Sequence, residues 1–159
     1  MTVRCPRCGT DDQRLQYRSG KMKNVCYDCQ NHHNITTTSA YKRFDAKDLN
    51  QVDRESFVTW KRGKVRKCHY CGITDQNGEI YALDVVNNRN GVRHEAVNVD
   101  RIDSDRPYVL ENLVLSCGLC NQIKSSNLTE EDMLQLGPIL LDILRRHRRE
   151  AYCCWMCNP

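Results

Sequence analysis

The chain has 159 residues, which leaves room for one domain, or for a small core with a satellite module, and excludes a second enzyme domain. No apolar run approaches the ~18 residues of a membrane span, and no basic-then-apolar leader stands before Cys5, so we expect no membrane partner. The net charge of +4 is mildly basic and by itself only weakly favours binding to nucleic acid.

Cysteine is strongly over-represented: the chain holds 11, so disulfides or metal sites must account for them. The spacing of the cysteines favours metal sites over disulfides, because two thiolates three positions apart can bind one tetrahedral zinc ion. Four such pairs stand before the tail, namely Cys5 with Cys8, Cys26 with Cys29, Cys68 with Cys71, and Cys117 with Cys120, and the remaining three cysteines form a tail cluster of Cys153, Cys154 and Cys157. We predict two structural Zn²⁺ ions per chain and a location in reducing cytoplasm, where zinc binding outcompetes disulfide formation.

Residues 1–31 are predicted to form an N-terminal four-cysteine zinc knuckle of the treble-clef or ribbon kind, closed by the first two pairs. Between the pairs, residues 14–20 alternate polar and apolar side chains before Gly20, which predicts a short hairpin. A segment this small depends on its metal for folding.

Residues 32–56 are polar and contain a run of threonines, so they are predicted to be a linker that tracks along a partner or along the core. Asp53 is a predicted N-cap, followed by a short amphipathic helix over residues 54–60. Phe57 and Trp60 lie three positions apart in it and are predicted to be core residues.

Residues 57–128 are predicted to form the main core, with the second four-cysteine zinc site inside it. Strands are expected over residues 80–86, 96–100 and 112–116, with turn signals between them, and a helix is expected to begin around Cys120. Together with the helices, this predicts a small zinc-stapled fold of the α+β class.

Residues 129–159 are predicted to be a C-terminal packing helix with a Cys-rich tail. Thr129 and the acidic residues after it mark the helix start, and an apolar stripe continues to Leu144. Two interpretations of the tail stay open: a third metal site that combines His147 with Cys153, Cys154 and Cys157, or an incidental apolar end around Trp155.

A polar pair stands next to the second zinc site. Asp100 ends one predicted strand, and Asn121 lies at the start of the helix after the last cysteine pair. A hairpin followed by a helix, with zinc stapling the two, brings these side chains face to face. A carboxylate and an amide oxygen are hard ligands, which with waters and a phosphate oxygen complete an octahedral Mg²⁺ site.

Several motifs occur at fixed spacings around this pair: Tyr70-Cys71-Gly72-Ile73, Val99-Asp100-Arg101-Ile102-Asp103-Ser104, Glu111-Asn112-Leu113, Cys117-Gly118-Leu119-Cys120-Asn121-Gln122-Ile123-Lys124-Ser125, and Asp132-Met133 with Leu136-Gly137. They resemble the HNH (ββα-metal) endonuclease family and, within it, the rare-cutting restriction enzymes. The resemblance is close over residues 57–137 and holds in outline for the N-terminal knuckle.

The resemblance implies a homodimeric enzyme that hydrolyses double-stranded DNA at a specific sequence, with two structural Zn²⁺ ions and one catalytic Mg²⁺, for which Mn²⁺ can substitute, in each subunit. It further implies a restriction-type role in a prokaryote or virus. It places Asp100 and Asn121 on the family's metal ligands, and Asn112 on the asparagine that pins the hairpin.

The sequence departs from the family at the general base. The position after the metal-binding aspartate is Arg101, where a histidine is common, and Arg101 cannot act as a base at neutral pH. The related restriction enzymes have a tyrosine after the tryptophan of the preceding helix, but here Trp60 is followed by Lys61. His32 or His33 is the first candidate base, with His94, Tyr41, Lys61 and a metal-bound water as alternatives. Arg101 is predicted to bind a phosphate.

Clustered cations are candidate DNA-binding residues. They comprise Lys61, Arg62, Lys64, Arg66, Lys67 and Lys124, with a second cluster at Arg145, Arg146, Arg148 and Arg149. A solvated helix face is the alternative explanation. Three other functions also remain open: a homing endonuclease, a zinc-dependent DNA-binding module with a degenerate nuclease centre, and an RNA-binding zinc protein.

Overall fold

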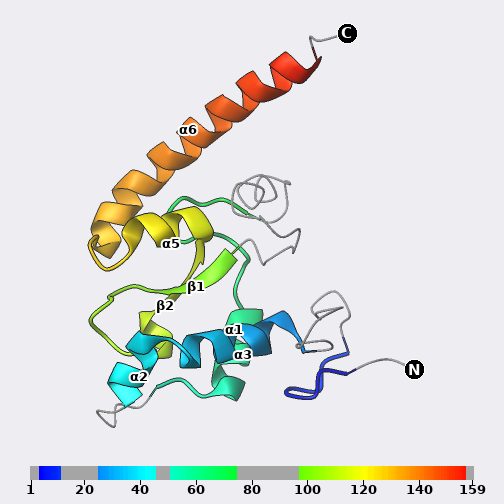
Figure 1. The fold of residues 1–159 in the computed structure, drawn as a ribbon, viewed down its shortest axis with the longest axis vertical. Helices are drawn as coiled ribbons and strands as arrows, with labels where there is room; N and C mark the ends of the chain where they lie inside the picture. The colour runs from blue at the N-terminus through cyan, green and yellow to red at the C-terminus, as the bar shows by residue number, and fades with distance from the viewer. Residues whose placement is uncertain (1–3, 12–24, 46–50, 75–96, 157–159) are drawn as a thin grey trace. The chain divides into compact units, whose positions relative to one another are not determined.

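The computed structural model describes residues 4–11, 25–45, 51–74 and 97–156. In chain order, the elements are α1 (Tyr27–Thr36), α2 (Ser39–Asp45), α3 (Arg54–Arg62), β1 (Val97–Arg101), the 3-10 turn η3 (Leu110–Asn112), β2 (Leu113–Cys117), α5 (Gly118–Lys124) and α6 (Glu130–Met156) (Figure 1). The predicted α+β class is confirmed. The predicted hairpin at 14–20 and strand at 80–86 lie outside the described residues. None of the described helices has the length and apolar character that a membrane crossing requires.

The chain divides into two compact units. Unit 1 comprises residues 1–65 with 104–113, and unit 2 comprises residues 66–103 with 114–159. Unit 1 therefore holds α1, α2 and α3, whereas unit 2 holds β1, α5, α6 and nearly all of β2. The division into segments 1–31, 32–56, 57–128 and 129–159 stays a prediction.

Much of the polar segment over residues 32–56, which was predicted to be a linker, is helical. The hydroxyls of Thr36, Thr37 and Thr38 each donate to the carbonyl three residues earlier, at 2.8 Å, and so turn the chain at the end of α1. The Thr38 hydroxyl then accepts from the Tyr41 amide in the first turn of α2. The threonine run is thus a turn between two helices, because its hydroxyls satisfy backbone groups at both helix ends.

Helix α3 begins where the sequence predicted. The Asp53 carboxylate accepts hydrogen bonds from the amides of Glu55 and Ser56, at 2.9 and 3.0 Å, which caps the helix. Phe57 is fully buried, and its ring packs against the His32 ring at 5.4 Å. Trp60, predicted to be core, is only partly buried, and the Lys64 ammonium lies 5.7 Å from its ring centroid.

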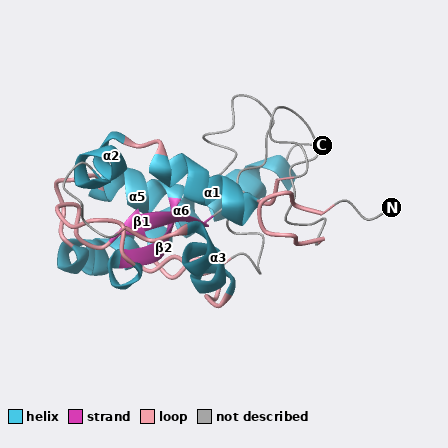
Figure 2. Cartoon of the chain, turned by 90° about the horizontal axis from the view of Figure 1, so that it is seen from below, coloured by secondary structure: helices cyan, strands magenta, loops and turns pink. Residues whose placement is uncertain are grey.

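In unit 2, β1 and β2 pair as a two-stranded antiparallel sheet, drawn in magenta in Figure 2. Helix α5 follows β2 without a break and contacts β1. The two predicted strands and the start of α6 are confirmed within one residue of their expected bounds, whereas the helix expected to begin around Cys120 begins two residues earlier, at Gly118.

Helix α6 packs on the Cys68–Cys71 segment. Met133 is fully buried, and Gly137 approaches the Tyr70 backbone so closely that a Cβ atom there would lie 2.5 Å from the Tyr70 carbonyl oxygen. Only glycine fits at this contact, which fixes the helix against the segment that carries Tyr70.

Candidate metal centres and catalytic site

The eight cysteines of the four predicted pairs form two clusters. Within each cluster the four sulfur atoms lie within 4.8 Å of one another, and all eight thiols are free of disulfides. A tetrahedral zinc with Zn–S bonds of ~2.3 Å needs sulfur separations of about 3.8 Å, and the Cys71 and Cys117 sulfurs are 3.8 Å apart. The residues present therefore fit zinc at both sites. We call them the first cluster (Cys5, Cys8, Cys26, Cys29) and the second cluster (Cys68, Cys71, Cys117, Cys120).

Both clusters begin with the same tight turn. In the first, the Gly9 amide donates to the Cys5 carbonyl at 2.8 Å; in the second, the Gly72 amide donates to the Cys68 carbonyl at 3.0 Å. Both glycines have positive φ, +73° and +76°, which other residues adopt only at a steric cost. The pattern Cys-x-x-Cys-Gly thus forms the same knuckle twice.

Both clusters end with the first turn of a helix. Cys26 is the N-cap of α1 and Cys117 is the N-cap of α5, and each sulfur accepts a hydrogen bond from the amide of the cysteine three residues later, at 3.4 and 3.5 Å. A knuckle joined to a helix N-terminus is a treble-clef arrangement, one of the two kinds, treble clef or ribbon, that the sequence left open for the first two cysteine pairs.

Asp100 lies on β1 in unit 2, the unit that also holds the second cluster, and two donors hold its carboxylate. The Tyr70 hydroxyl donates to Oδ2 at 2.8 Å, and the Lys124 ammonium lies 3.6 Å from the same oxygen. Burial, together with the Asp100 charge, raises the pKa of Tyr70 well above its usual range, so the hydroxyl keeps its proton and stays a donor. Within the described residues, these contacts use one oxygen and leave Oδ1 to accept another partner.

Lys124 was placed wrongly from the sequence. It was predicted to bind DNA, but it is fully buried, and besides its contact with Asp100 it donates to the Arg101 carbonyl at 2.8 Å. A buried ammonium requires such partners. The hydrogen bond from Tyr70 to Asp100 was not predicted from the sequence, although both residues stand in motifs that carry the family resemblance.

Asn121 lies on α5 one turn before Lys124. Residues three positions apart share a helix face, and Lys124 reaches the end of β1 from that face. Asn121 therefore lies on the side of α5 that contacts β1, and it is partly buried. The prediction that Asp100 and Asn121 share one metal ion rests on this placement of Asn121 on the helix face toward β1.

Asn112 lies in unit 1, in the segment between the two strands. It is fully buried, and its amide donates to the Pro107 carbonyl at 3.0 Å, which closes the 107–112 turn. This contact fits the predicted role of an asparagine that pins the connection between the strands. Arg101, the last residue of β1, is partly exposed.

The cations at the end of α3 divide into two groups. Lys61 is buried, and its ammonium lies 3.3 Å from the Asp28 carboxylate, so the prediction that Lys61 lies on a DNA-binding surface was wrong. Arg62 also binds Asp28, with its Nε 3.1 Å from the other carboxylate oxygen. The sequence could not show this, because Asp28 lies more than 30 positions away. Lys64, Arg66 and Lys67 are exposed.

The candidate bases belong to unit 1 or lie outside the described residues. A nitrogen of the His32 ring contacts the Val52 carbonyl at 3.2 Å, and burial lowers the pKa of His32, which favours its neutral form. His33 is exposed on α1, and the Tyr41 ring packs near the Tyr108 ring. His94 lies outside the described part of the chain. None of these observations tests their role, so the base stays a prediction.

The antiparallel hairpin, the helix that follows it and the cysteine clusters define the fold of an HNH nuclease. The chain is similar to a solved structure of the rare-cutting HNH restriction endonuclease PacI, an enzyme described as perturbing DNA: the TM-score is 0.66, 25% of residues are identical, and the match covers 89% of this chain and 94% of that chain. No family model and no curated protein sequence matches the chain. The similarity confirms the predicted resemblance and supports a nuclease of the HNH kind.

Proposed function

We propose that the chain is a metal-dependent, restriction-type endonuclease that hydrolyses double-stranded DNA at a specific sequence. The observation that carries this proposal is the Asp100 carboxylate, held through Oδ2 by Tyr70 and Lys124 beside the helix of Asn121. The structural similarity to PacI supports it, because that protein is an HNH restriction endonuclease.

The donor set fits a magnesium ion. Asp100 and Asn121 would supply a carboxylate and an amide oxygen, which hard divalent cations prefer. Bound there, magnesium supplies stabilisation of the negative charge that develops on the scissile phosphate and the leaving 3′ oxygen.

The other side chains of the site position the carboxylate and the substrate. The Tyr70 hydroxyl fixes the rotation of the Asp100 carboxylate, and Lys124 offsets its charge inside the protein. Arg101, the residue after Asp100 and the last residue of β1, carries a planar guanidinium that suits bidentate contact with a phosphate of the bound DNA strand.

A water molecule must lose a proton to attack the phosphate, and His32 is our first candidate to accept it. The Val52 carbonyl only accepts hydrogen bonds, so the neutral His32 ring places its proton on Nε2 and keeps the lone pair on Nδ1. His33 is the second candidate.

Contacts with the DNA backbone are assigned to the exposed cations Lys64, Arg66 and Lys67. We further propose a homodimer, because a twofold axis matches a palindromic DNA site. Eight free thiols in two clusters suit a reducing compartment such as the cytoplasm.

The proposal is tested by incubating the zinc-loaded chain with Mg²⁺ and a randomised duplex DNA library, and then sequencing the new ends. We expect ends that share one short sequence, and we expect them to vanish when EDTA removes the magnesium. Intact DNA at every magnesium and manganese concentration would contradict the proposal.

A second candidate function is a zinc-dependent DNA-binding module without nuclease activity. One observation favours it: Lys61, in the place of the expected tyrosine, is buried in an ion pair with Asp28. The same randomised DNA library distinguishes the two functions. A binding module without nuclease activity would enrich one DNA sequence in a filter-retention experiment but would produce no new DNA ends.

A further inference from the structure

The first cluster has charged neighbours outside its four sulfurs. Asp28 stands between Cys26 and Cys29, and its carboxylate is only 6% exposed. Its Oδ1 lies 3.3 Å from the Lys61 ammonium, and its Oδ2 accepts from Arg62 Nε at 3.1 Å. Two consecutive residues at the end of α3 thus hold one carboxylate of the zinc knuckle.

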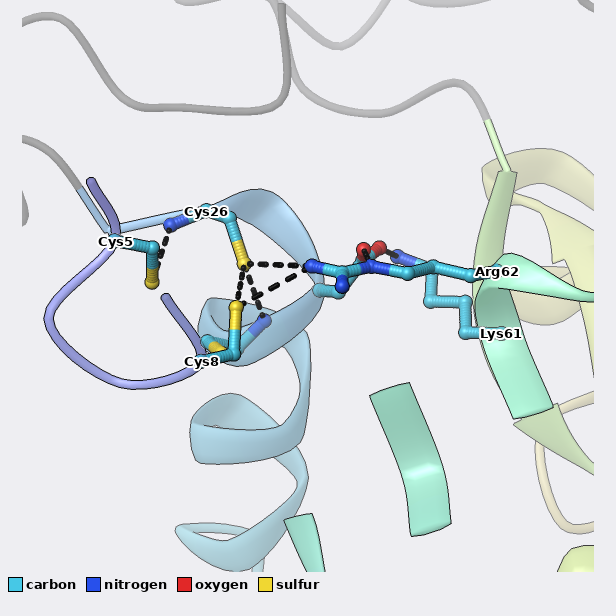
Figure 3. A network of polar contacts seen from close by, with 7 residues as sticks. Cys5, Cys8, Cys26, Lys61 and Arg62 are labelled. Atoms are coloured by element: carbon cyan, nitrogen blue, oxygen red, sulfur yellow. Dashed lines mark hydrogen bonds and ion pairs between the residues drawn. The ribbon is translucent and has the colours of Figure 1, made fainter. Parts of the chain in front are cut away.

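The other edge of the Arg62 guanidinium faces the sulfurs. Arg62 Nη2 donates to Cys8 Sγ at 3.3 Å and lies 3.8 Å from Cys26 Sγ. Figure 3 shows the Arg62 guanidinium facing the sulfurs of Cys8 and Cys26, with dashed lines marking these contacts. Arg62 therefore contacts cysteines from both halves of the first cluster, the Cys5–Cys8 knuckle and the start of α1.

Charge explains why this arrangement is stable. A zinc ion with four thiolates carries a formal charge of about −2, and Asp28 adds a further buried negative charge. Uncompensated charge in a protein interior is costly, and the two cations offset most of it. Without zinc and its thiolates, the cations would outnumber the one remaining anion.

We propose that Asp28, Lys61 and Arg62 form a clamp that ties the orientation of α3 to occupancy of the first zinc site, and that Arg62 slows zinc release from it. Successive helix residues point about 100° apart, so when both grip one carboxylate the helix loses its freedom to rotate about its axis. Outer contacts of this kind orient and retain metal ligands. This inference does not depend on the nuclease proposal.

The first test measures zinc release from the full-length chain to a chromogenic chelator. Replacing Cys5 by Ser identifies which release phase belongs to the first cluster. We expect Arg62→Gln to accelerate that phase by ~10-fold or more, Arg62→Lys to have an intermediate effect, and the matched control Lys64→Gln, which removes an exposed cation two positions on, to have none. Equal release from the Arg62→Gln, Lys64→Gln and unaltered chains would overturn the proposal.

The second test follows the helix and needs no assignment of release phases. We expect chelation of zinc to raise hydrogen exchange at the α3 amides of the unaltered chain. We expect Asp28→Asn with zinc fully bound to raise it at the same amides, by ~10-fold or more. Protected α3 amides in the zinc-loaded Asp28→Asn chain would show that the helix is held in another way and would overturn the clamp.

Discussion

The two cysteine clusters have the same internal construction and different surroundings. Each combines a Cys-x-x-Cys-Gly knuckle with the N-terminus of a helix. The first has Asp28 inside its second cysteine pair and the Arg62 guanidinium on its sulfurs. The second has Gly118 and Leu119 at the corresponding positions, so its second cysteine pair encloses no charged residue.

This difference indicates that the residues around a treble clef, rather than the clef itself, decide its use. In unit 1 the outer residues fasten a neighbouring helix. In unit 2 the same clef starts α5, whose Lys124 reaches Asp100 on β1. One local pattern thus supports a structural anchor in one unit and the platform of a candidate catalytic site in the other.

The largest expected effect follows from breaking the second cluster. Structural zinc contributes about 10–16 kcal/mol of apparent binding free energy to folding, so we expect Cys117→Ser to lose the fold of unit 2 together with all nuclease activity. Hydrogen exchange should show it, since β1, β2 and α5 lose protection. Cys5→Ser is the matched comparison and should leave these three elements protected. A soluble Cys117→Ser chain with two zinc ions would contradict the assignment.

The second prediction separates catalysis from stability at Asp100. Asp100→Ala removes a proposed metal ligand, and we expect DNA cleavage to fall by at least about 10³-fold, the upper range for one electrostatic contact. It also leaves the buried Lys124 ammonium without its carboxylate, which should cost ~3–5 kcal/mol of unfolding free energy.

The double variant Asp100→Ala with Lys124→Met removes both charges, so urea unfolding should show most of that stability restored while cleavage stays lost. If the double variant regained cleavage, Asp100 would not be a catalytic ligand.

The third prediction concerns the contact between α6 and the second cluster. A Cβ at Gly137 would lie 2.5 Å from the Tyr70 carbonyl oxygen, whereas one at Gly118 would meet no atom within 4 Å. We therefore expect Gly137→Ala to lower the unfolding free energy by ~1–3 kcal/mol, and Gly118→Ala to be neutral or stabilising. Thermal unfolding measures both. Equal stability of the two variants would mean that α6 does not pack as described.

Among the variants expected to change DNA cleavage, Tyr70→Phe should have the smallest effect. It removes one hydrogen bond to a charged group, worth about 1.5–3 kcal/mol, so cleavage should slow by ~10- to 100-fold while the zinc content stays unchanged. Raising the magnesium concentration should recover part of the rate, because the carboxylate is less well oriented but still present. A variant with the full rate would show that Tyr70 does not position Asp100.

Local signals in the sequence predicted much of this structure. The cysteine spacing predicted both clusters, Asp53 predicted the start of α3, and the strand patterns separated by turn signals predicted β1 and β2. The partners of Lys61 and Lys124 could not be predicted, because they depend on contacts with Asp28 and Asp100, more than 20 positions away in the sequence. Helices α1 and α2 were missed because their polar residues resemble those of a linker.

The central claim is that Asp100 and Asn121 share one metal ion. Its most direct test is a titration of the zinc-loaded chain with Mn²⁺, in which the electron paramagnetic resonance signal measures the concentration of free Mn²⁺. We predict one Mn²⁺ bound per chain, and weaker binding by ~10-fold or more in Asn121→Ala and in the double variant at Asp100 and Lys124. Equal Mn²⁺ binding by all three chains would contradict a shared metal site of Asp100 and Asn121.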